Sequence, residues 1–398
     1  MAFIELLAPA GDLARAKVAL DFGADSVYIG GKRFSLRYRA SNFEVSDIAE
    51  AVEYAHARGK RIFVTVNMIP HQGDLPGLKE YLLELQGIGV DAVIVASLGI
   101  ASLAKQVAPK MEVHLSTQLS ITNSESMRFY KELGVDRVVL ARELNLDTIG
   151  QIIDQNVLPV EVFIHGGMCV NYSGRCTLSN EMTLRDANRG GCAQSCRWSY
   201  DLHIAGEKVN PNDVPFSMGS KDLMALGSIE AMMKMGVYSL KIEGRMKSAY
   251  YIGVIVRAYR QWIDAINAGL NTPVLYNAII NELKQAESRP TFDGFLMSMP
   301  DQNGHLYHPK EEGVVQNFVG NVLEQKDDRI LVEMRNLVSI GQALECFSYH
   351  QDPQAFTITA MWDEEGQVLE VANKPMSKVW IQCDVDARAG DFLRKKNT

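Results

Sequence analysis

Four of the six cysteines in this chain lie in one polar, glycine-rich segment, residues 165–200. They follow the spacing C-x6-C-x15-C-x3-C and are Cys169, Cys176, Cys192 and Cys196. Four unrelated buried thiols are the alternative, because free cysteine is among the most buried residue types. Buried cysteines have apolar neighbours, however, and these four have few. The segment is therefore predicted to hold a metal centre.

The spacing also bears on the kind of metal. Clustered thiolates suit soft metals, as tetrahedral zinc or an iron–sulfur cluster. Zinc sites usually contain a C-x2-C pair, which this segment lacks, and the wide gaps favour the larger [4Fe–4S] cluster. Glycines such as Gly174 and Gly190 would let the backbone approach such a group closely. Zinc remains the alternative, while Cys346 and Cys383 lie in apolar β runs and are expected in a hydrophobic core.

Polar residues near the ends of several predicted strands could line a ligand pocket. Glu161 and His165 share one parity, and Lys241 and Glu243 oppose the apolar residues of their strand, so these four are the predicted catalytic residues. The predicted substrate-binding residues are Asn67, His114, Arg142, Lys221, Arg245 and Lys247. Their cations suit a carboxylate ligand. The alternatives are a structural Glu161–Lys241 ion pair and a satisfied, buried His114.

Two segments combine cations with aromatic side chains, a pattern that suits phosphate contact and base stacking. One is GKRFSLRYRASNF (31–43), which contains no acidic residue, and the other is the cysteine segment. The predicted RNA-binding residues are Arg37, Arg39, Arg189, Arg197 and Trp198. A solvated surface, or a loop that grips an anionic small molecule, would show the same pattern.

Short apolar runs alternate with amphipathic helical stretches up to about residue 270. The runs are 3–8, 26–30, 61–67, 91–97, 111–116, 136–141, 159–164 and 237–243. Eight such units predict a (β/α)8 barrel of the TIM type, and a doubly wound sheet is the alternative. The cysteine segment is then an insertion at about 165–215, after the seventh strand, on the face where these barrels carry their active sites.

The pattern changes at about residue 286, where helical periodicity gives way to short β runs separated by turns such as EEGQ and ARAGD. This change predicts two domains, a barrel over 1–285 and a small all-β barrel or sandwich over 286–398.

The bulk composition sets limits on partners and location. A net charge of -8 and a pI near 5.6 argue against a generally basic nucleic-acid coat and leave room for a local basic face. The sequence has neither a bilayer-length apolar run nor a signal-peptide pattern at its start. We therefore expect a cytoplasmic protein with no membrane partner, in which clustered cysteines bind metal rather than form disulfides.

The segment EVFIHGGMCVNYSGRCTLS (161–179) resembles the signature of peptidase family U32. The resemblance extends to LLAPAGD (6–12), ADSVYIGG (24–31), KIEGRMK (241–247), the cysteine spacing and the C-terminal β module. Gly167 departs from it, because the signature usually has Ser or Ala there. The family name implies a protease, but the sequence has no G-x-S-x-G, no H-E-x-x-H, and no further cysteine with a plausible histidine partner.

The resemblance otherwise implies oxygen-independent hydroxylation. Members carry a [4Fe–4S] cluster on these four cysteines and hydroxylate uridine or cytidine in RNA, or a ubiquinone precursor. The branch that this chain resembles acts at C5 of the tRNA wobble uridine and depends on prephenate, a dicarboxylate that would fit the cationic pocket. It implies tRNA, prephenate and iron–sulfur assembly machinery as partners. The alternatives are a peptidase or collagenase, a hydroxylase of ribosomal RNA or a quinone precursor, and an RNA-binding protein with a structural metal.

Overall fold

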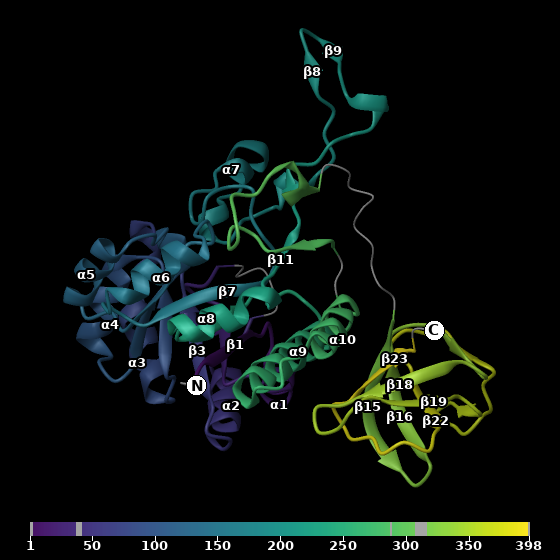
Figure 1. Ribbon diagram of the computed structural model, residues 1–398. Coiled ribbons are helices and arrows are strands. Elements are labelled where there is room, and N and C mark those ends of the chain that lie inside the picture. Colours follow the sequence, from purple (N-terminus) through teal and green to yellow (C-terminus); the bar gives the residue numbers. More distant parts are fainter. Residues whose placement is uncertain (1–2, 37–41, 287–288, 307–316, 397–398) are drawn as a thin grey trace.

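Eight parallel strands close into a barrel in the computed structural model, which describes residues 3–36, 42–286, 289–306 and 317–396 (Figure 1). The barrel strands are β1 (Glu5–Pro9), β2 (Ser26–Gly30), β3 (Arg61–Val66), β4 (Ala92–Val95), β5 (Glu112–Leu115), β6 (Arg137–Val139), β7 (Val160–Gly166) and β12 (Ser239–Ile242). Each pairs with the next, and β12 pairs with both β7 and β1. This closure confirms the predicted barrel and excludes the open, doubly wound sheet.

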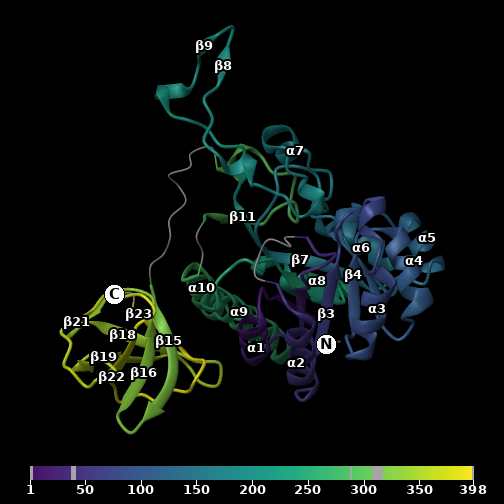
Figure 2. The ribbon, with the colours of Figure 1, turned by 180° about the vertical axis from the view of Figure 1, so that it is seen from behind.

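Helices between the strands cover the outside of the barrel (Figures 1 and 2). They are α1 (Leu13–Asp21), α2 (Val45–His56), α3 (Leu78–Gly87), α4 (Leu98–Val107), α5 (Ser124–Glu132), α6 (Leu146–Asp154), α8 (Ile229–Met235), α9 (Ala249–Ala268) and α10 (Pro273–Lys284). Several begin at a capping side chain, which satisfies a free backbone N–H of the first turn. Asp12 accepts from Arg15 N in α1, and Ser248 accepts from Tyr251 N in α9. Buried apolar residues between strands and helices form the main core.

The cysteine segment belongs to a long insertion between β7 and α8, on the side of the barrel where the strands end. It contains α7 (Leu178–Thr183), the hairpin β8 (His203–Ile204) and β9 (Glu207–Lys208), and the strands β10 (Gly219–Ser220) and β11 (Asp222–Met224). The hairpin stands well away from the barrel (Figures 1 and 2). Because β11 pairs antiparallel with the end of β7, the insertion is anchored to the barrel sheet.

A second module with its own hydrophobic core follows the barrel. Its antiparallel sheet has the order β19-β18-β23-β15-β16-β22-β20. The strands are β15 (Phe318–Lys326), β16 (Arg329–Met334), β18 (Ala343–Phe347), β19 (Gln354–Thr357), β20 (Met361–Trp362), β22 (Lys378–Gln382) and β23 (Phe392–Lys395), accompanied by the short pair β17 (Val338–Ser339) and β21 (Val371–Ala372). Cys346 and Cys383 are buried in this core, as predicted.

The chain between the two modules pairs with the insertion. The sequence pattern changes at 286, but β13 (Thr291–Phe292) pairs with β11, and β14 (His305–Leu306) pairs with β10. Aromatic rings then join the β module to the barrel helices: Phe347 stacks on Phe22 with ring centroids 5.6 Å apart, and Phe318 stacks on Tyr250 at 4.8 Å. Across the described residues, no helix combines the length and apolarity required to cross a membrane.

Candidate functional site: a cysteine-lined cavity at the barrel mouth

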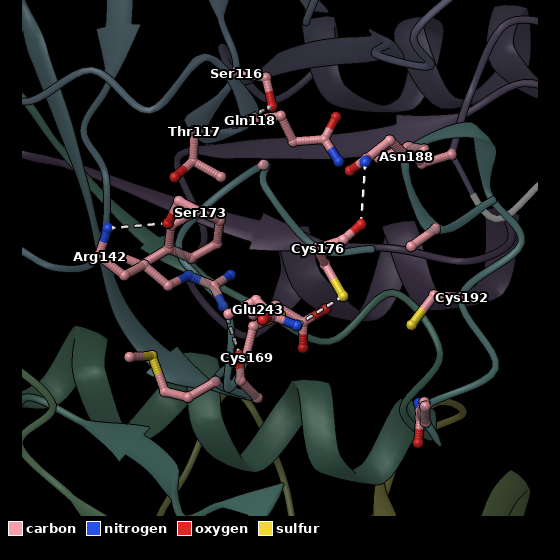
Figure 3. Close-up of a pocket in the computed structure, with 18 of the residues that line it drawn as sticks. Ser116, Thr117, Gln118, Arg142, Cys169, Ser173, Cys176, Asn188, Cys192 and Glu243 are labelled. Atoms are coloured by element: carbon pink, nitrogen blue, oxygen red, sulfur yellow. Dashed lines mark hydrogen bonds between the residues drawn. The ribbon is translucent and has the colours of Figure 1, made fainter. Parts of the chain in front are cut away.

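A cavity of about 330 Å³ opens where the barrel strands end, and all four clustered cysteines line it. Figure 3 shows Cys169, Cys176 and Cys192 around the cavity, with Arg142 and Glu243 close to Cys169. Residues of the strand ends and of the insertion share the lining. The structure therefore brings the predicted metal ligands to the face where barrel enzymes carry their active sites.

Amide side chains hold the cysteine loop in place. Asn171 Nδ2 donates to Cys176 Sγ at 3.0 Å, and Asn188 Nδ2 donates to the Cys176 carbonyl at 3.2 Å (Figure 3). Gly174 has a φ of +75° and lies so close to the Gln118 backbone that a Cβ would collide with it. This position thus requires glycine on both conformational and steric grounds.

The thiols are spread around the cavity rather than gathered at one point. Among the described residues, no three Cys, His, Asp or Glu side chains converge as ligands of a single ion. A [4Fe–4S] cluster takes one thiolate per iron, so four thiols around one cavity fit that group. Burial raises the pKa of Cys169, which Arg142 partly offsets, and burial raises the pKa of Cys196, which Arg197 partly offsets. The two arginines thus favour the thiolate form that a metal needs.

Several cationic side chains also line the cavity. The predicted residues that line the cavity besides the cysteines are Asn67, Arg142, Arg197, Lys241, Glu243, Arg245 and Lys247. Arg142 Nη1 donates to the Gly167 carbonyl at 2.6 Å, and its guanidinium lies 3.9 Å from the centroid of the Phe163 ring. Arg245 donates to Thr65 Oγ1 at 3.0 Å and to Asn42 Oδ1 at 2.9 Å. The guanidinium groups are therefore held in fixed orientations before any ligand binds.

Several buried polar atoms of this lining have no partner within the described part of the chain. They include Arg142 Nε, Glu143 Oε2 and Gln118 Oε1. Buried polar groups in native proteins are nearly always hydrogen-bonded, so such atoms indicate a site completed by water or by a polar ligand. Glu143 follows Arg142 in the chain and was not among the predicted site residues; its Oε1 accepts from Ser173 N at 2.9 Å.

A chain of alternating charges extends from the cavity floor into the barrel. Lys241 Nζ donates to Glu161 Oε1 at 2.6 Å, and Arg137 Nη1 donates to Glu161 Oε2 at 3.2 Å and to Glu5 Oε1 at 2.5 Å. Glu5 also accepts from Ser26 Oγ and Ser239 Oγ. Of this chain only Lys241 lines the cavity, so Glu161 lies one contact below it. Sequence reasoning missed Glu5 and Arg137.

The network sets the charge states of its members. Burial alone would raise the pKa of Glu161, but Lys241 and Arg137 reverse this effect and lower it. Burial lowers the pKa of Lys241, against the opposing effect of Glu161. Both groups are charged in the ion pair, and the Lys241 ammonium presents its charge to the cavity at the end of a rigid support.

The two predicted histidines do not line the cavity. His114 is fully buried inside the barrel, where Nε2 contacts Glu112 Oε2 at 2.8 Å and the ring meets Phe63 edge-on at 4.9 Å. His165 points out of the barrel, and its Nδ1 lies 3.2 Å from Tyr259 Oη of α9. The register between β7 and β12 shifts after Lys241, so Phe163 and His165 pair with consecutive residues of β12. This irregularity breaks the shared parity expected for Glu161 and His165.

His165 is expected to stay neutral at all pH values near neutrality. Burial lowers its pKa to about 3, so the imidazole is protonated only in strong acid and carries no charge above pH 5. Its ring signals in an NMR titration should stay constant between pH 5 and 8. The exposed His203 serves as the comparison, and the variant His165→Gln assigns the signals. A His165 shift that moves across this range would contradict the observed burial.

The remaining predicted residues lie outside the cavity or outside the described part of the chain. Lys221 donates its backbone N–H to the Gly304 carbonyl at 3.0 Å, and Trp198 is 44% exposed on the insertion. Arg189 pairs with Asp74 and lines a neighbouring cavity. Arg37 and Arg39 lie outside the described residues.

The fold and the site define a TIM-type barrel whose mouth carries a cysteine-lined cavity. Residues 11–306 match peptidase family U32, and residues 315–394 match the U32 C-terminal domain. The chain belongs to peptidase family U32.

Three relatives with described activities are similar to this chain over most of its length. The chain is 41% identical to tRNA hydroxylation protein P1 of Bacillus subtilis, over 98% of this chain and 94% of that protein. It is 32% identical to tRNA hydroxylation protein P of Escherichia coli, over 99% and 96% of the two chains. It is also 44% identical to a 23S rRNA 5-hydroxycytidine synthase of E. coli, over 86% of this chain and 52% of that protein.

Proposed function

We propose that this protein hydroxylates uridine in tRNA at C5, at the wobble position, without molecular oxygen and with prephenate as co-substrate. The observation that carries the proposal is one cavity lined by four thiols and five of the predicted cationic residues, in a chain homologous over nearly its whole length to tRNA hydroxylation proteins. Those five are Arg142, Arg197, Lys241, Arg245 and Lys247.

Cys169, Cys176, Cys192 and Cys196 would hold a [4Fe–4S] cluster in this proposal. When bound, the cluster supplies iron that can exchange electrons or polarise an oxygen-bearing ligand. The chain itself orients the ligands, because Arg142 and Arg197 flank the thiols and are fixed by bonds to the Gly167 and Met168 carbonyls. Placing a substrate in fixed geometry beside the reacting groups is a major source of rate enhancement.

The cationic lining suits prephenate, whose two carboxylates carry two negative charges. Arg142 and Arg245 both line the cavity and offer guanidinium groups, which bind carboxylates through paired hydrogen bonds. Lys241 adds a positive charge at the floor. Glu243 is the carboxylate of the predicted set that lines the cavity, which supports a role in taking the proton that leaves C5 of the uracil ring.

The proposal is tested by the nucleoside content of tRNA. A deletion strain that also lacks any oxygen-dependent route should lose 5-hydroxyuridine-derived nucleosides, and a plasmid copy of the wild-type gene should restore them, measured by mass spectrometry after anaerobic growth. A strain unable to make prephenate should show the same loss until prephenate is supplied. Unchanged nucleosides in the deletion strain would contradict the proposal.

Ribosomal RNA is the second candidate substrate, favoured by the 44% identity to the 23S rRNA 5-hydroxycytidine synthase. The same cavity and cations would serve a cytidine, because the pyrimidine C5 position is common to both bases. Mass spectrometry of 23S rRNA from the same strains distinguishes the two: loss of 5-hydroxycytidine with intact tRNA nucleosides would favour this candidate.

A further inference from the structure

A second cavity, of about 450 Å³, lies against the cysteine-lined one and has no role in the site described so far. The two cavities share their walls, because Ser35, Met68 and Gly191 line the second, whereas the residues next to them in the chain, Leu36, Asn67 and Cys192, line the first. Arg245, which lines the first cavity, donates to Ser35 Oγ at 3.1 Å. A ligand that occupies both would therefore pass over a wall about one residue thick.

Backbone contacts keep this shared wall in place. Ile69 N donates to the Asn188 carbonyl at 3.1 Å, and Met68 N donates to the Phe34 carbonyl at 3.2 Å. Arg189 reaches the Ile69 carbonyl at 3.2 Å and pairs through both nitrogens with Asp74. Arg189 thus ties the cysteine segment to the loop after β3. The second cavity is a built part of the fold, with a volume in the usual range for ligand sites.

The lining of the second cavity is cationic. It contains Lys32, Arg33, Arg185 and Arg189 against Asp74 and Asp186. Arg189 pairs with Asp74 and Lys32 pairs with Glu44, while Arg33 meets Glu84 only at 3.9 Å and is half exposed. Arg185 is exposed and has no carboxylate partner among the described residues. An exposed arginine of this kind, in a concave site lined by further cations, suits a phosphate group.

Leu184 lines this cavity with an exposed side chain and a left-handed backbone, both of which are unfavourable for leucine. Its side chain is 94% exposed, and its backbone is left-handed, with a φ of +55° at the C-terminal end of α7. The conformation is fixed, because Leu184 N donates to the Asn180 carbonyl at 3.0 Å and Arg185 N donates to the Ser179 carbonyl at 3.3 Å. Glycine or asparagine would suit this position better. Because the exposed side chain and the left-handed backbone both cost free energy, a rigid leucine at this position indicates contact with a partner.

We propose that the second cavity binds the nucleotide adjacent to the target base in a single-stranded RNA substrate. The phosphate lies against Arg185 and its cationic neighbours, and Leu184 packs between the adjacent base and the target base. This inference rests on the proposed function. A base must leave its stack before a buried site can act on it, and apolar wedges such as leucine separate neighbouring bases in other complexes. The thin shared wall then lets consecutive nucleotides enter the two cavities.

The test uses anaerobically purified full-length protein and an RNA stem-loop with 2-aminopurine on either side of a loop uridine. Wild-type protein should change the 2-aminopurine fluorescence as the base unstacks. Leu184→Asn should remove that change and weaken binding roughly tenfold, because the apolar wedge that separates the two bases is lost. Asparagine suits the left-handed backbone, so the variant should fold normally. Leu270→Asn is the matched control, since Leu270 is 65% exposed just beyond α9.

Arg185→Gln supplies a second measurement. It should weaken binding of every RNA sequence and reduce the salt dependence of the dissociation constant by about one phosphate contact. Unaltered binding and fluorescence for Leu184→Asn, or equal losses for Leu270→Asn, would overturn the proposal. Hydroxylation is measured in the same samples to separate the subsite from the proposed function. If Leu184→Asn binds and modifies RNA as the wild type does, the subsite is wrong and the proposed function stands. If binding depends on Leu184 but no protein hydroxylates the RNA, the proposed function is wrong and the subsite stands.

Discussion

Under the proposed function, replacing Cys176 with alanine is expected to abolish hydroxylation and to remove most of the iron of the proposed cluster. Cys176 lines the cavity with the other three thiols, and its sulfur is oriented by the Asn171 amide. A cubane that loses one of four thiolates loses the covalent bond to one iron. Changes to groups that only orient a metal ligand already lower metal affinity or activity by about 10–100-fold. We expect activity to fall roughly 100-fold or more, measured as 5-hydroxyuridine in tRNA together with iron and sulfide per chain.

Cys383→Ala is the matched control for this experiment. Cys383 is a buried cysteine in the core of the C-terminal β module, whereas Cys176 is partly exposed at the cavity. Its removal should reduce stability modestly through lost packing and leave iron content and hydroxylation near wild type. Asn171→Ala tests the orientation of Cys176 separately and should give an intermediate loss. If Cys176→Ala retained iron and full activity, the four-thiolate site would be wrong.

Local sequence patterns were sufficient to predict the barrel, because each strand is a short apolar run between amphipathic helices. The run at 26–30 coincides with β2, and those at 61–67 and 91–97 contain β3 and β4. All residues of β1, β2 and β7 are buried, as expected for parallel strands covered on both faces. The four cysteines were likewise recognisable from type and spacing, and the structure places all of them around one cavity.

Contacts between distant strands could not be predicted in the same way. In the sequence, Arg137 is only a polar residue at the start of an apolar run. Its partner Glu5 lies 132 residues away in the chain, so no local pattern connects the two. The bulge between β7 and β12 is equally invisible, because no glycine or proline lies between Glu161 and His165 to mark it. Strict alternation therefore placed His165 beside Glu161, whereas the structure turns its ring toward α9. Pairing and register depend on closure of the whole barrel.

Arg137→Met is expected to destabilise the barrel strongly. Arg137 is 2% exposed and lies between two buried carboxylates, Glu5 and Glu161, at 2.5 and 3.2 Å. Removing one partner from a buried charge network leaves an uncompensated charge, which costs about 3–5 kcal/mol. Methionine roughly preserves the length of the side chain, so lost charge rather than lost volume dominates. The shift in the denaturant midpoint of barrel unfolding measures the effect, and Arg128→Met is the control, since Arg128 forms an exposed pair with Glu125 worth about 0–1 kcal/mol.

The loss of stability caused by Arg137→Met should become smaller as the pH falls. In the wild-type protein the pKa of Glu161 is lowered, so this carboxylate stabilises the fold above the ordinary carboxyl pKa of about 4 and loses that contribution as the pH falls through the lowered value. In the variant the carboxylate keeps only Lys241 as a partner, so its pKa rises and protonation relieves the unpaired charge. The stability difference should therefore be large at pH 7 and shrink toward pH 4 and below. A difference that stays constant across this range would show that Arg137 acts through packing alone, and that the charge chain beneath Lys241 does not hold the cavity floor.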